Sequence, residues 1–526
     1  MVEKFVREGF LYTEESLMDA LGFSMNTADE KTSFQMLIRA LKLKKLLRTR
    51  KKKGSKESDD DDASLLLESD SDYDDFVGIE SDNVQFLFRF VGVIFYKDRV
   101  INVYPKYIES SSEPKEEMRQ VLRVLLKHQG KKYYLGVSEM LETEEQKNEI
   151  NMLSIMLFLL NDYAENGLYS EDESIIEYNG EGVIDWQRTV DMTYPLIESG
   201  APYYVDFFTR RKIENDMNYC VRLHKYVLTE ATSELEHLGL TDIFNLPVLD
   251  LSDEEGDSFG EFDAIIEKID AEMGVQFDDR KSAVLKALLL YFNQKYKRNT
   301  NTISYGEDEL DFFGTRAFHS VWESVIDEVY VSQKKMTFET IKNEYVPKFG
   351  YAIKLPNNET AYIDPQMELG SIIERPQWNL KEEAKSVNTH TYYPKDTFIP
   401  DYLRFNEACD EFYILDAKYY LPRWYLSSDG GAHIYGQPGV EDVAKQYLYY
   451  LAYRPLLKHN GIDIRNVKNY FVMPTELEDE DMGFTKIGFF ADILPNIFDI
   501  RVKMLNAKTL FSHYLNNDKL DVTSIV

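Results

Sequence analysis

The sequence is poor in the residues that define several common classes of site. It has 526 residues but only two cysteines, Cys220 and Cys409, which excludes a disulfide scaffold and a multi-cysteine zinc module. No apolar run approaches the roughly 18–20 residues that a membrane-spanning helix needs, and the first residues lack the apolar core of a signal peptide. We therefore expect a protein of the reducing cytoplasm without a membrane partner.

Several catalytic signatures are also missing. The eight histidines are scattered singly, and the sequence contains no His-Glu-x-x-His, no Gly-x-Ser-x-Gly and no dinucleotide-binding glycine pattern. It also lacks the Gly-x-x-x-x-Gly-Lys-Ser/Thr loop that binds nucleotide phosphates. If the function requires nucleotide hydrolysis, another subunit must supply it.

Basic residues are outnumbered, because 92 Asp and Glu face 60 Lys and Arg and give a net charge of −32. Such a chain repels a polyanion at long range, so binding to DNA requires local basic patches, metal ions or a partner. Hydrophobic residues make up 44% of the chain, and 36 Tyr and 31 Phe dominate its aromatics. This composition is sufficient for sizeable folded cores.

Charge and texture divide the chain into four predicted parts. Residues 1–50 form a small helical unit, 51–80 a charged disordered linker, 81–300 an α+β region for recognition or partner docking, and 301–526 a C-terminal domain that bears the candidate site described below. The basic run Arg39–Lys56 is either an arm that contacts DNA or a solvated helix end. The candidate DNA contacts within this run are Lys51, Lys52 and Lys53.

The region 81–300 begins with a predicted β-hairpin, because charged residues at 97–99 separate two runs rich in β-branched and aromatic residues. Helical periodicity follows at 115–128, 145–163, 205–236 and 281–299. Arg210, Arg211 and Lys212 adjoin aromatic residues, an arrangement found on surfaces that contact phosphates. The alternative is an ordinary helix start with solvated charges.

The C-terminal part alternates between helical and strand patterns. Helices are predicted at 313–330 and 440–453, and strands at 351–355, 397–405, 411–420 and 466–474. The order helix, strands, helix, strand indicates a mixed α/β unit with one covered sheet. The whole chain is therefore expected to be mixed α/β, with an α+β region before a C-terminal α/β core.

Two strands of this core bear the candidate chemistry. Pro400-Asp401 and Asp416-Ala417-Lys418 are one hairpin length apart, so an antiparallel pair would bring both carboxylates to one end of the sheet. Two close carboxylates repel unless a cation lies between them, and hard oxygen ligands suit Mg²⁺ or Mn²⁺. Ala417 would offer its backbone carbonyl as a further ligand, and Lys418 would orient or deprotonate the attacking water.

A bare Asp-x-Lys is common in so charged a chain, and a salt bridge at a sheet edge is its simplest explanation. The ordered set is rarer, because a helix with Lys445, Gln446 and Tyr450 follows the strands. Gln446 and Tyr450 share a helix face, where they would brace DNA or the metal ligands, although Tyr450 also suits core packing. Lys445 is a further candidate DNA contact.

These motifs resemble those of the PD-(D/E)xK nuclease superfamily, including its variant with a Gln-x-x-x-Tyr helix. The resemblance implies that an acidic residue on the first core helix joins the metal site, and Glu323 in HSVWESV occupies that place. Asp416 departs from the wider pattern, in which Glu is commoner.

The segments FGTRAFHSVWESV, FIPDYLRF and LDAKYY, together with the Gln446 helix, resemble the LlaJI family of restriction endonuclease subunits. The hairpin FVGVIFYKDRVINVYPKYI is similar to the N-terminal region of McrC, a restriction nuclease subunit. The resemblance implies a Mg²⁺-dependent endonuclease that cuts double-stranded DNA with a separately encoded McrB-like GTPase motor. Two alternatives remain: a repair or recombination nuclease with the same site, and an acidic protein that mimics DNA without catalysis.

Overall fold

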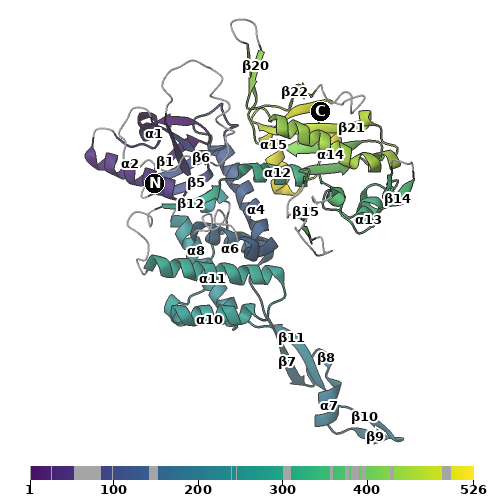
Figure 1. Cartoon of the computed structure of the whole chain (residues 1–526). Coiled ribbons are helices and arrows are strands. Elements are labelled where there is room, and N and C mark those ends of the chain that lie inside the picture. The colour runs from purple at the N-terminus through teal and green to yellow at the C-terminus, as the bar shows by residue number, and fades with distance from the viewer. Residues whose placement is uncertain are drawn as a thin grey trace. The chain divides into compact units, whose positions relative to one another are not determined.

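The computed structural model describes residues 2–24, 27–51, 84–96, 99–140, 152–237, 240–244, 246–299, 310–355, 359–373, 378–380, 390–392, 398–426, 432–487 and 499–525. The chain is mixed α/β, as predicted, and divides into two compact units (Figure 1). One unit comprises residues 1–128 and 314–526, and the other comprises 129–313. No helix in the described ranges is both long and apolar enough to cross a bilayer.

This grouping differs from the predicted four-part division, because residues 1–128 cluster with the C-terminal segment. The first 50 residues contain strands as well as helices, since all six residues of VEKFVR pair in parallel with a later strand. The predicted linker 51–80 lies outside the described residues except for Lys51. The elements before residue 141 are β1 (Val2–Arg7), β2 (Leu11–Thr13), α1 (Glu14–Ala20), α2 (Ala28–Leu43), β3 (Leu47–Lys51), β4 (Val84–Phe88), β5 (Val91–Tyr96), β6 (Arg99–Tyr104) and α4 (Lys115–Met140).

Two sheets organise this N-terminal part. The predicted hairpin is present as β5 and β6, which pair antiparallel, while β1 pairs with β6 in parallel. Strand β4 lies between β2 and β3 in a second sheet. Every residue of β5 is buried, so this hairpin is a core element.

The unit 129–313 contains helices and a β-rich segment. Its elements are α6 (Met152–Asn166), β7 (Asp172–Tyr178), β8 (Val183–Ile184), α7 (Trp186–Met192), β9 (Leu196–Glu198), β10 (Ala201–Tyr203), β11 (Phe208–Glu214), α8 (Tyr219–His237), α9 (Thr241–Phe244), α10 (Phe262–Met273) and α11 (Asp279–Asn299). The predicted helix at 205–236 is therefore wrong for its first part, where β11 pairs antiparallel with β7. The helix predicted at 281–299 is confirmed by α11.

The C-terminal segment folds around a five-stranded sheet. Its elements are β12 (Leu310–Thr315), α12 (Phe318–Val329), α13 (Phe338–Thr340), β13 (Ala352–Lys354), β14 (Thr360–Tyr362), β15 (Trp378–Leu380), β16 (His390–Tyr392), β17 (Tyr402–Phe405), β18 (Phe412–Ala417), β19 (Arg423–Leu426), β20 (Ala432–Tyr435), α14 (Val440–His459), β21 (Val467–Thr475), β22 (Glu480–Thr485), β23 (Ile500–Asn506) and α15 (Ala507–Asn516). The sheet has the order β17-β18-β21-β23-β22.

Helices cover both faces of this sheet. All residues of β18 are buried, and successive side chains of a strand point to opposite faces. Phe412 and Ile414 pack in the apolar core that also contains Tyr447 and Tyr453 of α14. Helix α12 packs with α15, where the Trp322 ring lies 6.2 Å from that of Phe511. The candidate site therefore belongs to a rigid, doubly covered sheet.

Candidate active site

The two candidate carboxylates are adjacent. Strands β17 and β18 pair antiparallel with Tyr402 opposite Leu415, which places Asp401 next to Asp416 at the end of the pair. Asp401 is held in place by the backbone N–H of Ala417, which donates to its Oδ2 over 3.0 Å. The predicted hairpin is therefore present and brings both carboxylates to one end of the sheet.

Burial and mutual repulsion disfavour the charged forms of both acids. Burial, and then the charge of Glu323, raise the pKa of Asp401 to about 6, although Lys418 and the Ala417 N–H oppose the shift. Burial, and then the charge of Asp401, raise the pKa of Asp416 to about 7. A cation bound between them would remove this repulsion, because it favours both ionised forms.

Lys418 neutralises part of this charge. Its Nζ lies 2.8 Å from Oδ2 of Asp416 and 3.2 Å from Oδ1 of Asp442. Burial lowers the pKa of Lys418, but the charges of Asp416, Asp442 and Asp401 raise it by more, so the net pKa is raised. Lys418 is therefore an ammonium ion at neutral pH, which favours orientation of water and charge stabilisation over proton removal.

Helix α14 lines the site with a face that the sequence motif identified only in part. Asp442, Gln446 and Tyr449 follow one another at spacings of four and three residues, so they share one face of the helix. Gln446 is fully buried, and neither polar atom of its amide has a hydrogen-bond partner among the described residues. An unpaired buried amide is costly, so Gln446 is suited to hydrogen-bond a group bound at this position.

Tyr449 of α14 is close enough to both carboxylates to sense their charges. Its hydroxyl donates to the carbonyl of Ile399 over 3.4 Å, and burial together with the charges of Asp416 and Asp401 raises its pKa. Tyr450 is also buried in the apolar core. Burial raises its pKa, and the charges that act on it are those of Arg454 and Asp463 rather than those of Asp416 and Asp401. Tyr450 stays a prediction of the sequence motif, and the periodicity from Asp442 adds Tyr449 as a second candidate.

Glu323 lies on α12 and is half-buried. It is close enough for its charge to raise the pKa of Asp401. Nevertheless, no group of three or more His, Cys, Asp or Glu side chains is arranged to hold a metal ion in the described part of the chain. The charge of Glu323 therefore acts on Asp401, but Glu323, Asp401 and Asp416 do not form a cluster of three carboxylates arranged around one metal position.

A second lysine, missed by the sequence motif, supports the site. Lys334 donates from Nζ to the backbone carbonyl of Asp401 and lies 3.2 Å from Oδ1 of Asp327. On the other side of Asp416, the carbonyl of Val472 accepts from the Lys418 backbone N–H over 3.0 Å and from the Trp322 indole over 3.1 Å. These contacts fix the strand ends that bear the carboxylates.

The donor set fits a divalent cation such as Mg²⁺. This ion usually takes one or two protein carboxylates and fills its other positions with water and substrate phosphate. Asp401 and Asp416 would supply those carboxylates, and the repulsion between them is the observation that supports the fit. The backbone N–H of Ala417 donates to Asp401, so the backbone of Ala417 lies at the same strand end as the two carboxylates. The carbonyl of Ala417 stays a predicted further ligand.

The described residues among the predicted DNA contacts lie on separate elements. Lys51 ends β3, opposite Val84, whereas Lys52 and Lys53 lie outside the described residues. Lys445 is half-buried on α14, beside Gln446.

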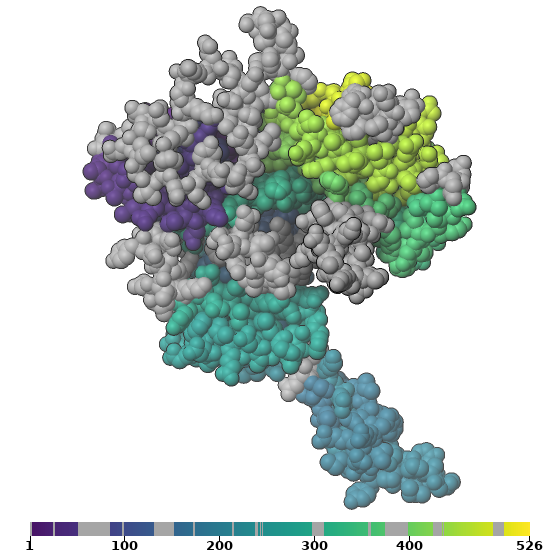
Figure 2. All heavy atoms as spheres, in the orientation of Figure 1, coloured from purple at the N-terminus to yellow at the C-terminus, as the bar shows by residue number. Residues whose placement is uncertain are grey.

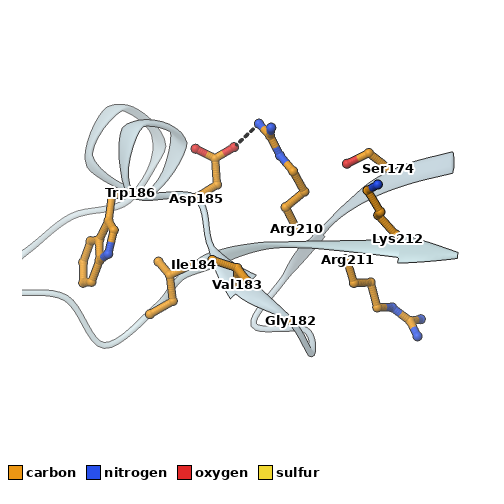
Figure 3. A pocket seen from close by; sticks show the side chains of 9 residues that line it. All are labelled: Ser174, Gly182, Val183, Ile184, Asp185, Trp186, Arg210, Arg211 and Lys212. Atoms are coloured by element: carbon orange, nitrogen blue, oxygen red, sulfur yellow. Dashed lines mark hydrogen bonds and ion pairs between the residues drawn. The ribbon is translucent and has the colours of Figure 1, made fainter. Parts of the chain in front are cut away.

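Arg210 and Arg211 lie on strand β11, so the alternative of a helix start is wrong. Arg210 pairs with Asp185 over 2.8 Å, and Arg211 pairs with Glu177 over 3.0 Å. Figure 3 shows Arg210 and Asp185 joined across an open groove that Trp186 and Ile184 also line. The segment from β7 to β11 (172–214), drawn in blue in Figure 2, exposes several large apolar side chains, including Val183, Trp186, Met192 and Tyr194.

The fold and the site define a mixed α/β protein with a paired-carboxylate and lysine site at a sheet end. The model of the LlaJI restriction endonuclease family matches residues 90–361 and 358–504. The chain therefore belongs to the LlaJI restriction endonuclease family.

A curated relative and two solved structures are similar to the chain. It is 28% identical over 458 residues to the Type II restriction enzyme BsuMI component YdjA of Bacillus subtilis strain 168, which covers 83% of each chain. A half-complex of Thermococcus gammatolerans McrB AAA+ hexamers with bound McrC matches at 14% identity and a TM-score of 0.33, covering 98% of this chain and 100% of the other. The McrBC complex of the same organism matches at 11% identity and a TM-score of 0.21, covering 62% and 86%.

Proposed function

We propose that the chain is the DNA-cutting subunit of a restriction system and hydrolyses phosphodiester bonds with Mg²⁺ or Mn²⁺. The observation that carries the proposal is the buried pair Asp401 and Asp416 with the Lys418 ammonium 2.8 Å from Asp416. Family membership supports a restriction endonuclease rather than a repair nuclease or a DNA mimic. The relative in B. subtilis, a component of a Type II restriction enzyme, is consistent with this role.

Each residue of the site has a separate role in this proposal. Asp401 and Asp416 would hold the metal ion, which supplies Lewis-acid activation of water and neutralises the phosphate. Lys418 orients the water and stabilises the negative charge that develops on the phosphate. Gln446 offers a buried amide without a partner among the described residues to the water or the DNA backbone. Glu323 contributes negative charge near Asp401.

We further propose that a separately encoded McrB-like GTPase works with this chain on double-stranded DNA. This part rests on the resemblance of the β5–β6 hairpin to McrC and on the lack of a phosphate loop in the sequence. A subunit held on DNA by a motor does not need a strongly cationic surface, which reconciles the activity with a net charge of −32.

Incubation of plasmid DNA with the protein, Mg²⁺ and its genomic neighbour, with and without GTP, tests the proposal. We expect cleavage that EDTA abolishes and that Asp401→Asn and Asp416→Asn eliminate. Cleavage without the neighbour would remove the motor from the proposal. Undiminished cleavage by either variant would reject the site.

A further inference from the structure

Lys418 has two acidic partners that are held differently. Asp416 lies on β18, an interior strand of the sheet, next to Asp401, whereas Asp442 lies in the first turn of α14. Asp442 is fixed by its own contact, because its Oδ2 accepts from the backbone N–H of Gly439 over 3.3 Å. Its other oxygen, Oδ1, remains for the Lys418 ammonium at 3.2 Å.

A metal ion would weaken the attraction of Lys418 to only one of its two acidic partners. Under the proposed function, the ion binds Asp416, and a cation there repels the ammonium that now lies 2.8 Å from the same carboxylate. Asp442 is not part of the proposed metal ligand set, so it continues to attract Lys418. All three side chains are at most 21% exposed, and water screens such interactions only weakly.

We propose that Asp442 is a positioning residue that receives the Lys418 ammonium when the metal ion occupies Asp416. This inference rests on the proposed function, because it assumes a metal ion at that carboxylate. Asp442 thereby lowers the cost of metal binding and keeps Lys418 charged beside the phosphate. Without Asp442, the ion pair with Asp416 is the one that the described residues leave to Lys418, and the metal ion would have to displace it.

Mn²⁺ binding to the full chain, measured by calorimetry without DNA, tests this role in a double-mutant cycle. Asp442→Asn keeps an oxygen that can accept from Gly439 but removes the charge. We expect about tenfold weaker Mn²⁺ binding in the wild-type background, a typical coupling for residues in contact. In a Lys418→Met background no ammonium competes for Asp416, so the same substitution should change binding by less than about twofold.

Glu441→Gln is the matched control, because Glu441 is the preceding acid in the same helical turn and is exposed. Its removal should leave Mn²⁺ binding unchanged. Asp442→Glu should restore most of the affinity, and the melting temperature of each metal-free variant verifies folding. If Asp442→Asn instead fails to fold, a much lower affinity in Asp442→Ser than in Asp442→Glu must supply the same comparison.

Equal losses of affinity in both backgrounds would overturn the inference, because Asp442 would then act on the metal ion directly. No loss in either background, or no Mn²⁺ binding by the wild type, would overturn it as well. Failure of the proposed function is distinguishable: the wild type would bind Mn²⁺ with the expected coupling but would not cut DNA with its neighbour.

Discussion

At Asp416, the proposed metal binding and the stability of the metal-free fold make opposite demands. In the unfolded chain its carboxyl ionises near pH 4, whereas in the fold its pKa is about 7. Between these values the folded state keeps a proton that the unfolded state has lost, so the stability that the bound proton contributes is lost as pH rises through about 7. The metal-free protein should therefore be less stable at pH 8 than at pH 5 on account of this group.

The first prediction follows from this loss of stability at high pH. Asp416→Asn should raise the free energy of unfolding by about 1–3 kcal/mol at pH 8 in EDTA, but by much less at pH 4. Urea denaturation at both pH values measures the difference. Mn²⁺ should stabilise the wild type at pH 8, by about 2.7 kcal/mol at 100 times its Kd, and should stabilise the variant less. A variant that is destabilised equally at both pH values would contradict the prediction.

The second prediction concerns the effect of Lys418 on the cleavage rate. Lys418→Ala should lower the cleavage rate on the order of 10²-fold or more, because it removes a preorganised charge from the reacting phosphate. DNA affinity, measured in Ca²⁺ to prevent cutting, should change little by comparison. Binding that falls in proportion to cleavage would instead make Lys418 an anchor for DNA.

At the scale of the element, the sequence was informative where a pattern is local. The antiparallel pair β17 and β18 was predictable because alternating apolar residues and a hairpin-length gap are visible within about twenty residues. Strand β11 was not, because the strand is held by pairing with β7, more than 30 residues earlier, and a local window cannot show that partner. Asp442 and Lys334 were missed for the same reason, since nothing in their own segments points to Lys418 or Asp401.

Helix α14 supplies the third prediction, because adjacent tyrosines face different surroundings. Tyr449→Phe removes the hydroxyl next to Asp416 and Asp401 and should lower cleavage measurably, by about threefold to tenfold for one lost hydrogen bond. Tyr450→Phe keeps the aromatic ring in the apolar core and should cleave like the wild type. Equal activities would remove Tyr449 from the site, and a larger loss in Tyr450→Phe would restore the role predicted from the sequence motif.

At the scale of the whole molecule, the excess of acids makes any contact with DNA dependent on salt and on local bases. The basic run that ends in Lys51, Lys52 and Lys53 remains the candidate predicted from the sequence. Replacing these three lysines with Ala should weaken binding about equally on target and non-target DNA, since phosphate contacts carry no sequence information. The slope of log affinity against log salt should fall by up to about three. An unchanged slope would mean that the run is a solvated tail and that recognition lies within residues 83–300.

The first 128 residues belong to the same compact unit as the candidate site, a relation that no local sequence pattern reveals. The contact is direct at Tyr419, the residue after Lys418. Its hydroxyl donates to Oε2 of Glu8 over 2.5 Å and accepts from the Lys106 backbone N–H over 3.1 Å. The Tyr419 ring also lies 5.0 Å from that of Phe318, at the start of α12. Residues that follow strands β1 and β6 therefore hold the chain next to Lys418.

This packing gives the last prediction. A fragment of residues 314–526 should lack a cooperative thermal transition, because it loses the buried partners of Tyr419 and exposes apolar surface. A chain in which a flexible linker of about 20 residues replaces 129–313 should keep a cooperative transition and stabilisation by Mn²⁺, since it retains the complete unit. Calorimetry of both proteins measures the contrast. If the fragment alone melted cooperatively and was stabilised by Mn²⁺, the nuclease segment would be an independent domain, as the four-part division assumed, and residues 1–128 would be free to act only in recognition.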